Sequence, residues 1–201
     1  RYTINHKKMK RLFFSFLLTG CLAIGLSAQN TDHRAVVSDS LEVYLQANYD
    51  KDYDKIMDMV YPKLFDIVAR EEMIAMFKGM ESEGIEFEIS NGGVDQISDL
   101  VVHDAERFAR VDYHMDMMMR FTGIEYEAET TQNVIFSSLQ AQYGEENVSR
   151  KDGAFYITTD KTMVAIAPLD AESWKFMEMN KDQPQLLEML LPQEIIEAFS
   201  K

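Results

Sequence analysis

The sequence predicts an α+β domain, in which N-terminal helices are followed by a mostly antiparallel sheet and short C-terminal helices. Between residues 37 and 80, apolar side chains recur at helical spacing. After Gly84 the period changes to two, which is typical of strands with one buried face. The 201 residues contain no internal repeat or linker, so one domain is expected over residues 29–201.

The first 28 residues have the parts of a secretory signal sequence. A basic stretch, Lys7–Arg11, precedes fifteen mostly apolar residues, Leu12–Leu26, and the small residue Ala28 stands before Gln29. A transmembrane helix needs about 20 apolar residues, so no integral membrane span is expected. The Ser-Ala-Gln end resembles that of exported Bacteroidetes proteins. We expect cleavage before Gln29 and a periplasmic or secreted product.

A second processing site lies inside the same segment. Leu18–Cys21 resembles a bacterial lipobox, so a lipoprotein anchored through Cys21 is the alternative. The apolar run continues past Cys21 to Leu26, which favours the soluble product. Because Cys21 is the only cysteine, cleavage before Gln29 leaves a domain without thiol or disulfide chemistry.

The chain is strongly acidic, with 34 acidic against 20 basic residues and a net charge of −14. Five of the basic residues lie in the leader, so the mature domain is more acidic still. Such a surface repels nucleic acid and anionic lipid, so neither is an expected partner. No phosphate loop, zinc-binding His-Glu-x-x-His or nucleophile motif occurs, and no cofactor is expected.

Three N-terminal helices are predicted. The first has one face formed by residues at helical spacing, namely Val37, Leu41, Tyr44, Leu45 and Asn48. Asp52 is a suitable N-cap for the second, which Pro62 ends. The third predicted helix contains Phe77.

Several strands and helices are predicted after Gly84. The strands are 85–89, 94–102 after a turn at Asn91-Gly92-Gly93, 108–121, one beginning at Ile124, a hairpin of 154–159 with 163–167 about Asp160-Lys161, and one at 174–177. Helices are predicted over 133–143, 186–190 and 194–199.

The long strand 108–121 carries the candidate metal ligands. Asp112, His114 and Asp116 project from one face, where carboxylate and imidazole groups could bind a divalent ion. Neighbouring positions on one strand face are about 6.6 Å apart, which is long for chelation. The alternative is a solvated face with cross-strand ion pairs, flanked by Arg110 and Arg120.

The opposite face of that strand is rich in methionine. The run His114–Met119 resembles methionine stretches of copper-handling proteins, since thioether sulfur is a soft ligand for cuprous ion. However, Met115, Met117 and Met119 continue an apolar face that begins at Ala109, which favours a place in the core. Copper handling is the minor alternative.

The segment from Tyr44 to Pro62, YLQANYDKDYDKIMDMVYP, followed by the helix Arg70–Phe77, resembles the opening of the nuclear transport factor 2-like, or ketosteroid-isomerase-like, superfamily with its cystatin-like fold. The resemblance extends over residues 35 to 180. It implies a cone, in which a curved sheet wraps around the helices and encloses an apolar pocket. Some members isomerise, cyclise or dehydrate small molecules, and many only bind them.

The resemblance also implies site residues. Tyr44 corresponds to the tyrosine that stabilises an oxyanion in the isomerases, and Asp66 is the candidate for the general base. The second oxyanion acid has no counterpart, so we expect non-catalytic binding of a small apolar ligand or a protein partner, with Asp66 outside the pocket. An isomerase or lyase is the alternative function. The sequence leaves open whether the protein forms a homodimer. Tyr44, Tyr113, Met117 and Trp174 are the expected pocket residues.

Overall fold

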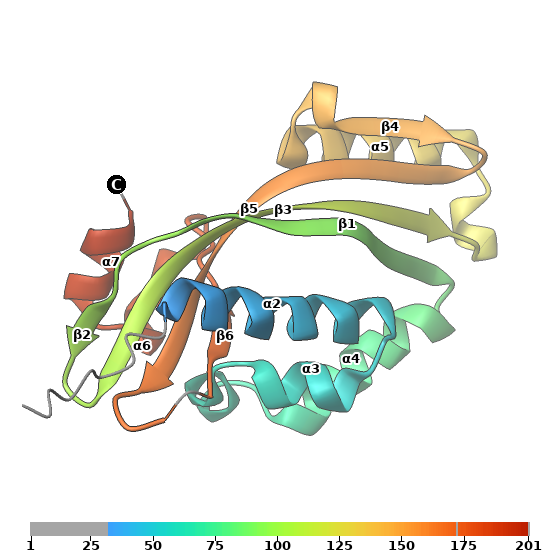
Figure 1. Cartoon of the computed structure of the whole chain (residues 1–201). Helices are drawn as coiled ribbons and strands as arrows, with labels where there is room; N and C mark the ends of the chain where they lie inside the picture. The colour runs from blue at the N-terminus through green and yellow to red at the C-terminus, as the bar shows by residue number, and fades with distance from the viewer. Residues whose placement is uncertain (1–31, 172, 201) are drawn as a thin grey trace, which may run out of the picture. The chain divides into compact units, whose positions relative to one another are not determined.

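A computed structural model describes residues 32–171 and 173–200, and the chain from His33 onward forms one compact unit (Figure 1). The predicted leader, with Cys21 and the cleavage position before Gln29, lies outside the described residues. Among the helices that are described, none is long and apolar enough to cross a membrane.

The described residues confirm the α+β class. The helices α2 (His33–Tyr49), α3 (Tyr53–Met59), η1 (Pro62–Asp66, a 3₁₀ helix) and α4 (Arg70–Ser82) come first. The strands β1 (Ile85–Ile97), β2 (Val101–His103) and β3 (Glu106–Phe121) follow. Then come η2 (Ile124–Tyr126), α5 (Glu129–Tyr143), η3 (Glu145–Asn147), β4 (Val148–Lys151), β5 (Ala154–Pro168), β6 (Lys175–Glu178), α6 (Pro184–Leu190) and α7 (Gln193–Phe199).

The sheet is antiparallel and has the order β1-β3-β5-β4, with β2 added to β3 and β6 added to β5. Its centre is the ladder between β3 and β5, which runs without a break from Glu106 opposite Pro168 to Arg120 opposite Ala154. The long strands bend around α2 (Figure 1), so that the N-terminal helix lies within the curve of the sheet.

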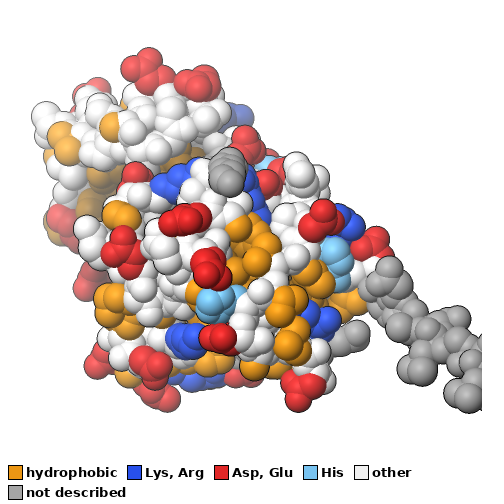
Figure 2. All heavy atoms as spheres, turned by 90° about the vertical axis from the view of Figure 1, so that its left-hand side faces the viewer, with side chains coloured by type: hydrophobic (Ala, Val, Ile, Leu, Met, Phe, Trp, Pro, Cys, Tyr) orange, Lys and Arg blue, Asp and Glu red, His pale blue; other side chains and the backbone are white. Residues whose placement is uncertain are grey.

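Each face of the sheet has a hydrophobic core. On the inner face, α2 and α5 pack on alternate residues of β3 and β5, with Val37, Leu41 and Phe155 buried. On the outer face, Phe108 and Ile166 pack against α6 and α7. Figure 2 shows that end of the domain, where hydrophobic side chains are interspersed with acidic and basic ones. The beginning of β3 and the end of β5 are therefore buried from both sides.

The predicted faces of the long strand are confirmed. Val111, Tyr113, Met115 and Met117 are buried in the inner core, whereas His114 between them is exposed. The alternation of apolar and polar residues predicted these faces because β3 is covered on only one side beyond Ala109.

The turn predicted at Asn91-Gly92-Gly93 is wrong. This tripeptide lies inside β1, where the register with β3 shifts between Ser90 and Gly93. Asn91 has a φ of 48°, which is the left-handed conformation expected at a bulge. Glycine at position 92 allows the close contact between β1 and α2, because a Cβ there would lie 2.8 Å from the Tyr49 hydroxyl of α2. The glycines therefore bring β1 close to α2 and do not reverse the chain.

The hairpin predicted about Asp160-Lys161 is also wrong, because residues 154–168 form the single strand β5. A two-residue hairpin loop requires positive φ, and neither Asp160 nor Lys161 has it. Both residues instead stay in the ladder with β3, opposite His114 and Tyr113.

The strand predicted to begin at Ile124 is also wrong. Residues 124–126 form η2, and the helix predicted over 133–143 begins earlier, at Glu129. Both edges of β3 are already paired at its end, Phe121 with Ile85 and Arg120 with Ala154. The segment after β3 therefore has no free strand edge nearby to join.

Candidate functional site

A pocket of about 230 Å³ lies between the N-terminal helices and the end of the sheet. Its walls come from α2, α3, α4, the end of β6 and α6. Most of the lining side chains are apolar: Ile56, Met57, Val60, Leu64, Met73, Phe77, Met163, Phe176, Met177, Leu186, Leu187 and Leu190. A concave, mainly apolar site with a few polar groups is the usual form of a small-molecule site.

The polar lining groups fall into two local groups, one on α2 and one after β6. Tyr44 and Asn48 are one turn apart on α2, and the Asn48 amide donates to the Tyr44 backbone carbonyl at 2.8 Å. Glu178 and Asn180 lie two residues apart, and the backbone N–H of Gln183 donates to the Asn180 carbonyl at 3.1 Å. The pocket therefore has a polar part and a larger apolar part.

Burial and the charge of Glu178 both act on the phenol of Tyr44. Burial raises the pKa of the Tyr44 phenol to about 12, the negative charge of Glu178 adds to this, and a hydrogen bond from Asn48 opposes it. The Tyr44 ring also packs on Phe176, with ring centroids 5.6 Å apart. The phenol is consequently neutral at physiological pH and available as a hydrogen-bond donor.

Two side chains outside the lining hold the Glu178 carboxylate. The Tyr113 hydroxyl donates to Oε2 at 3.1 Å, and Lys161 Nζ lies 2.9 Å from Oε1. Burial, followed by the charge of Glu178, raises the pKa of Tyr113 as well. Tyr113 and Lys161 are cross-strand partners on β3 and β5, so the ladder itself fixes where Glu178 can sit.

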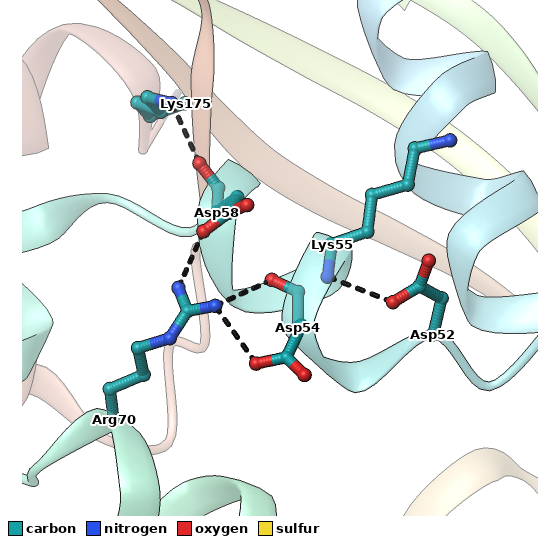
Figure 3. A network of polar contacts seen from close by, with 6 residues as sticks. All are labelled: Asp52, Asp54, Lys55, Asp58, Arg70 and Lys175. Atoms are coloured by element: carbon teal, nitrogen blue, oxygen red, sulfur yellow. Dashed lines mark hydrogen bonds and ion pairs between the residues drawn. The ribbon is translucent and has the colours of Figure 1, made fainter.

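The helical wall of the pocket is fixed by polar contacts (Figure 3). Arg70, at the start of α4, donates to the Asp58 carboxylate at 2.6 Å and to the Asp54 carbonyl at 2.9 Å, both on α3. Lys175 of β6 donates to the Asp58 carbonyl at 2.6 Å. Just after α3, the backbone N–H of Tyr61 donates a hydrogen bond to the Phe176 carbonyl. These contacts tie α4, α3 and β6 together around the cavity.

The sequence-predicted pocket residues are divided among three places. Tyr44 lines the pocket. Tyr113 does not line it, but contacts Glu178 behind the wall. Met117 is buried in the inner core, and Trp174 is buried with the Arg107 guanidinium 5.0 Å from its ring centre. Asp66 is exposed on η1 and is not among the lining residues.

The candidate metal ligands on β3 each have separate partners. Asp112 accepts from Arg110 at 3.0 Å and from Thr162 at 2.7 Å. His114 Nδ1 lies 2.7 Å from Asp95, and Asp116 accepts from Asn91 and Thr158. Within the described part of the chain, no three His, Cys, Asp or Glu side chains are grouped to hold a metal ion.

The methionines proposed for copper lie in the inner core. Met115 and Met117 are buried, and Met119 packs against the same cluster. A different set of methionines lines the pocket, namely Met57, Met73, Met163 and Met177. Methionine adapts its shape readily, so this wall can adjust to ligands of different outline.

The residues that sequence reasoning missed are Glu178, Lys161 and the leucines of α6. One signal was present, because Phe176 and Glu178 are two apart on a strand and must share a face. The leucines gave no such signal, since their spacing fits any core helix. Their role depends on where α6 packs.

Comparison of the chain with protein-family models, with curated proteins and with solved structures gave no match. The relationship to the nuclear transport factor 2-like superfamily therefore stays a prediction from the sequence, and the function of the pocket has to be inferred from its own residues.

Proposed function

We propose that this protein is an exported, non-catalytic binding module, and that its pocket holds a small, mainly apolar molecule. The observation that carries the proposal is the cavity of about 230 Å³, which is lined by twelve apolar side chains and five polar or charged ones. The volume lies slightly below the roughly 300–1,000 Å³ of ordinary ligand pockets, which suits a small ligand.

The position of Asp66 supports binding without chemistry. A general base must lie within hydrogen-bond reach of the proton that it removes. Asp66 is exposed and is not among the residues that line the pocket. The isomerase alternative therefore lacks the base that the sequence suggested.

Native mass spectrometry of the purified protein tests the proposal. We expect a retained small molecule, or a mass increase after incubation with 1-octanol. Leu186→Trp should abolish this, because Leu186 lines the pocket and indole fills it. Met189→Trp is the matched control, since Met189 is 66% exposed on the same helix. If Leu186→Trp binds as well as the control, with both folded by circular dichroism, the pocket is not the binding site.

Export is a separate part of the proposal, and it is supported by the arrangement of basic and apolar residues before Gln29. N-terminal sequencing of the protein from a bacterial host should begin at Gln29. A diacylated Cys21 in the membrane fraction would contradict the soluble form.

A further inference from the structure

We infer that the pocket selects its ligand by the charge of the head group, taking amines before alcohols and alcohols before carboxylates on the same apolar chain. The inference rests on the proposed binding function and adds the chemical class of the ligand.

Glu178 sets the sign of the charge in the pocket. Of the described residues that line the cavity, it alone carries a formal charge at neutral pH, and none is Lys, Arg or His. Asn48, Asn180 and Gln183 are amides, which can donate or accept and so do not discriminate. A ligand carboxylate would lie near Glu178 with no lining cation to compensate it.

The nearby lysine does not cancel this preference. Lys161 Nζ lies 2.9 Å from Glu178 Oε1 and is not among the lining residues, so an incoming anion would have to compete with Glu178 for it. Each carboxylate oxygen has two acceptor positions. Lys161 and Tyr113 therefore leave capacity on Glu178 for a donor from the ligand.

Tyr44 does not oppose this selection. Burial raises the pKa of the phenol to about 12, so at neutral pH it adds a neutral hydroxyl and no charge of its own to the pocket. The surrounding field has the same sign, because the chain carries 34 acidic and 20 basic residues. An ammonium head thus gains from both the local carboxylate and the overall charge.

Three eight-carbon probes, octylamine, 1-octanol and octanoate, test the inference by isothermal titration calorimetry at neutral pH. We expect octylamine to bind about tenfold or more tightly than octanoate, as one partly screened charge contact provides. Octanoate binding as tightly as octylamine would overturn the inference and leave the binding function intact. Failure of all three probes to bind would overturn the proposed function itself.

Glu178→Gln separates the local charge from the overall charge. It should reduce the ratio of octylamine to octanoate affinity by about tenfold, because it removes the lining charge and frees Lys161. Glu188→Gln is the control, as this exposed residue of α6 does not line the pocket but changes the net charge equally. An equal effect of both variants would overturn the assignment to Glu178. If Glu178→Gln does not fold, the ranking in the wild type still decides.

Discussion

The backbone N–H of Gly92 donates a 2.8 Å hydrogen bond to the Tyr49 hydroxyl, which joins the bulge of β1 to the C-terminal end of α2. The contact requires that residue 92 has no side chain, since a Cβ would also lie 3.2 Å from Leu45. The bulge and the helix are thus fitted to one another at a single residue.

Gly92→Ala should lower the free energy of unfolding by about 1–3 kcal/mol, because the methyl group forces α2 and β1 apart. Gly79→Ala provides the matched control. A Cβ at Gly79 meets nothing within 4 Å, and alanine in a helix is favoured over glycine by about 0.5–1 kcal/mol. Urea denaturation of both variants measures the difference, and equal effects would contradict the close contact.

Met117→Asp should destabilise the domain by several kcal/mol, since it places an unpaired charge in the inner core, where Met117 is 4% exposed. The neighbouring change Asp116→Asn should cost less than about 1 kcal/mol, because the amide oxygen can still accept from Thr158 and the contact with Asn91 that is lost is exposed. Thermal melts of the two variants test the faces of β3. Similar melting temperatures would mean that the faces are wrong.

Arg70→Gln should lower the free energy of unfolding slightly, because α4 loses its polar attachment to Asp54 and Asp58. The difference should shrink in about 1 M salt, which screens the charges. Lys78→Gln makes the same charge change at an exposed position of α4 and should have a smaller effect. A loss that does not respond to salt would point to packing instead of charge.

Stability at alkaline pH should depend on Tyr44. The folded state raises its pKa from 10 to about 12, so the folded protein keeps a proton that the unfolded chain releases. The corresponding stability is fully present below pH 10 and is lost as the pH rises from about 10 to about 12. Tyr44→Phe should make this decline shallower in urea titrations across that range.

Tyr156→Phe is the control for the alkaline titration. Tyr156 is 42% exposed and does not line the pocket, so this substitution removes one phenol hydroxyl without changing the pocket. A decline that both variants share equally would show that the alkaline loss does not come from Tyr44.

The parts of the fold that could be predicted are those in which one face of a single element is buried. The spacing of Leu41 and Leu45 in α2 and of Val111 and Tyr113 in β3 reports that burial directly. The errors occurred where local chemistry and tertiary pairing disagree. Asn91-Gly92-Gly93 has the composition of a turn, yet the partner strand continues past it and converts the turn into a bulge.

The pocket could be predicted only in part, because its walls come from segments far apart in the chain. Tyr44 was identifiable from the face of one helix. Glu178 became part of the site through its cross-strand neighbour Met163 and through the contact from Tyr113. Trp174 was expected in the pocket because of its size, but a large aromatic side chain fits the core equally well, and Arg107 covers it.

The uninterrupted pairing of β3 with β5 has a consequence for how the chain folds. Its shortest link joins Arg120 to Ala154, 34 residues apart, and its longest joins Glu106 to Pro168, 62 residues apart. None of these pairs forms until a large loop has closed, and domains dominated by such distant pairs fold in milliseconds to seconds instead of microseconds. Both hydrophobic cores have walls on these two strands. The helices can therefore form early, but neither core is complete until the ladder closes.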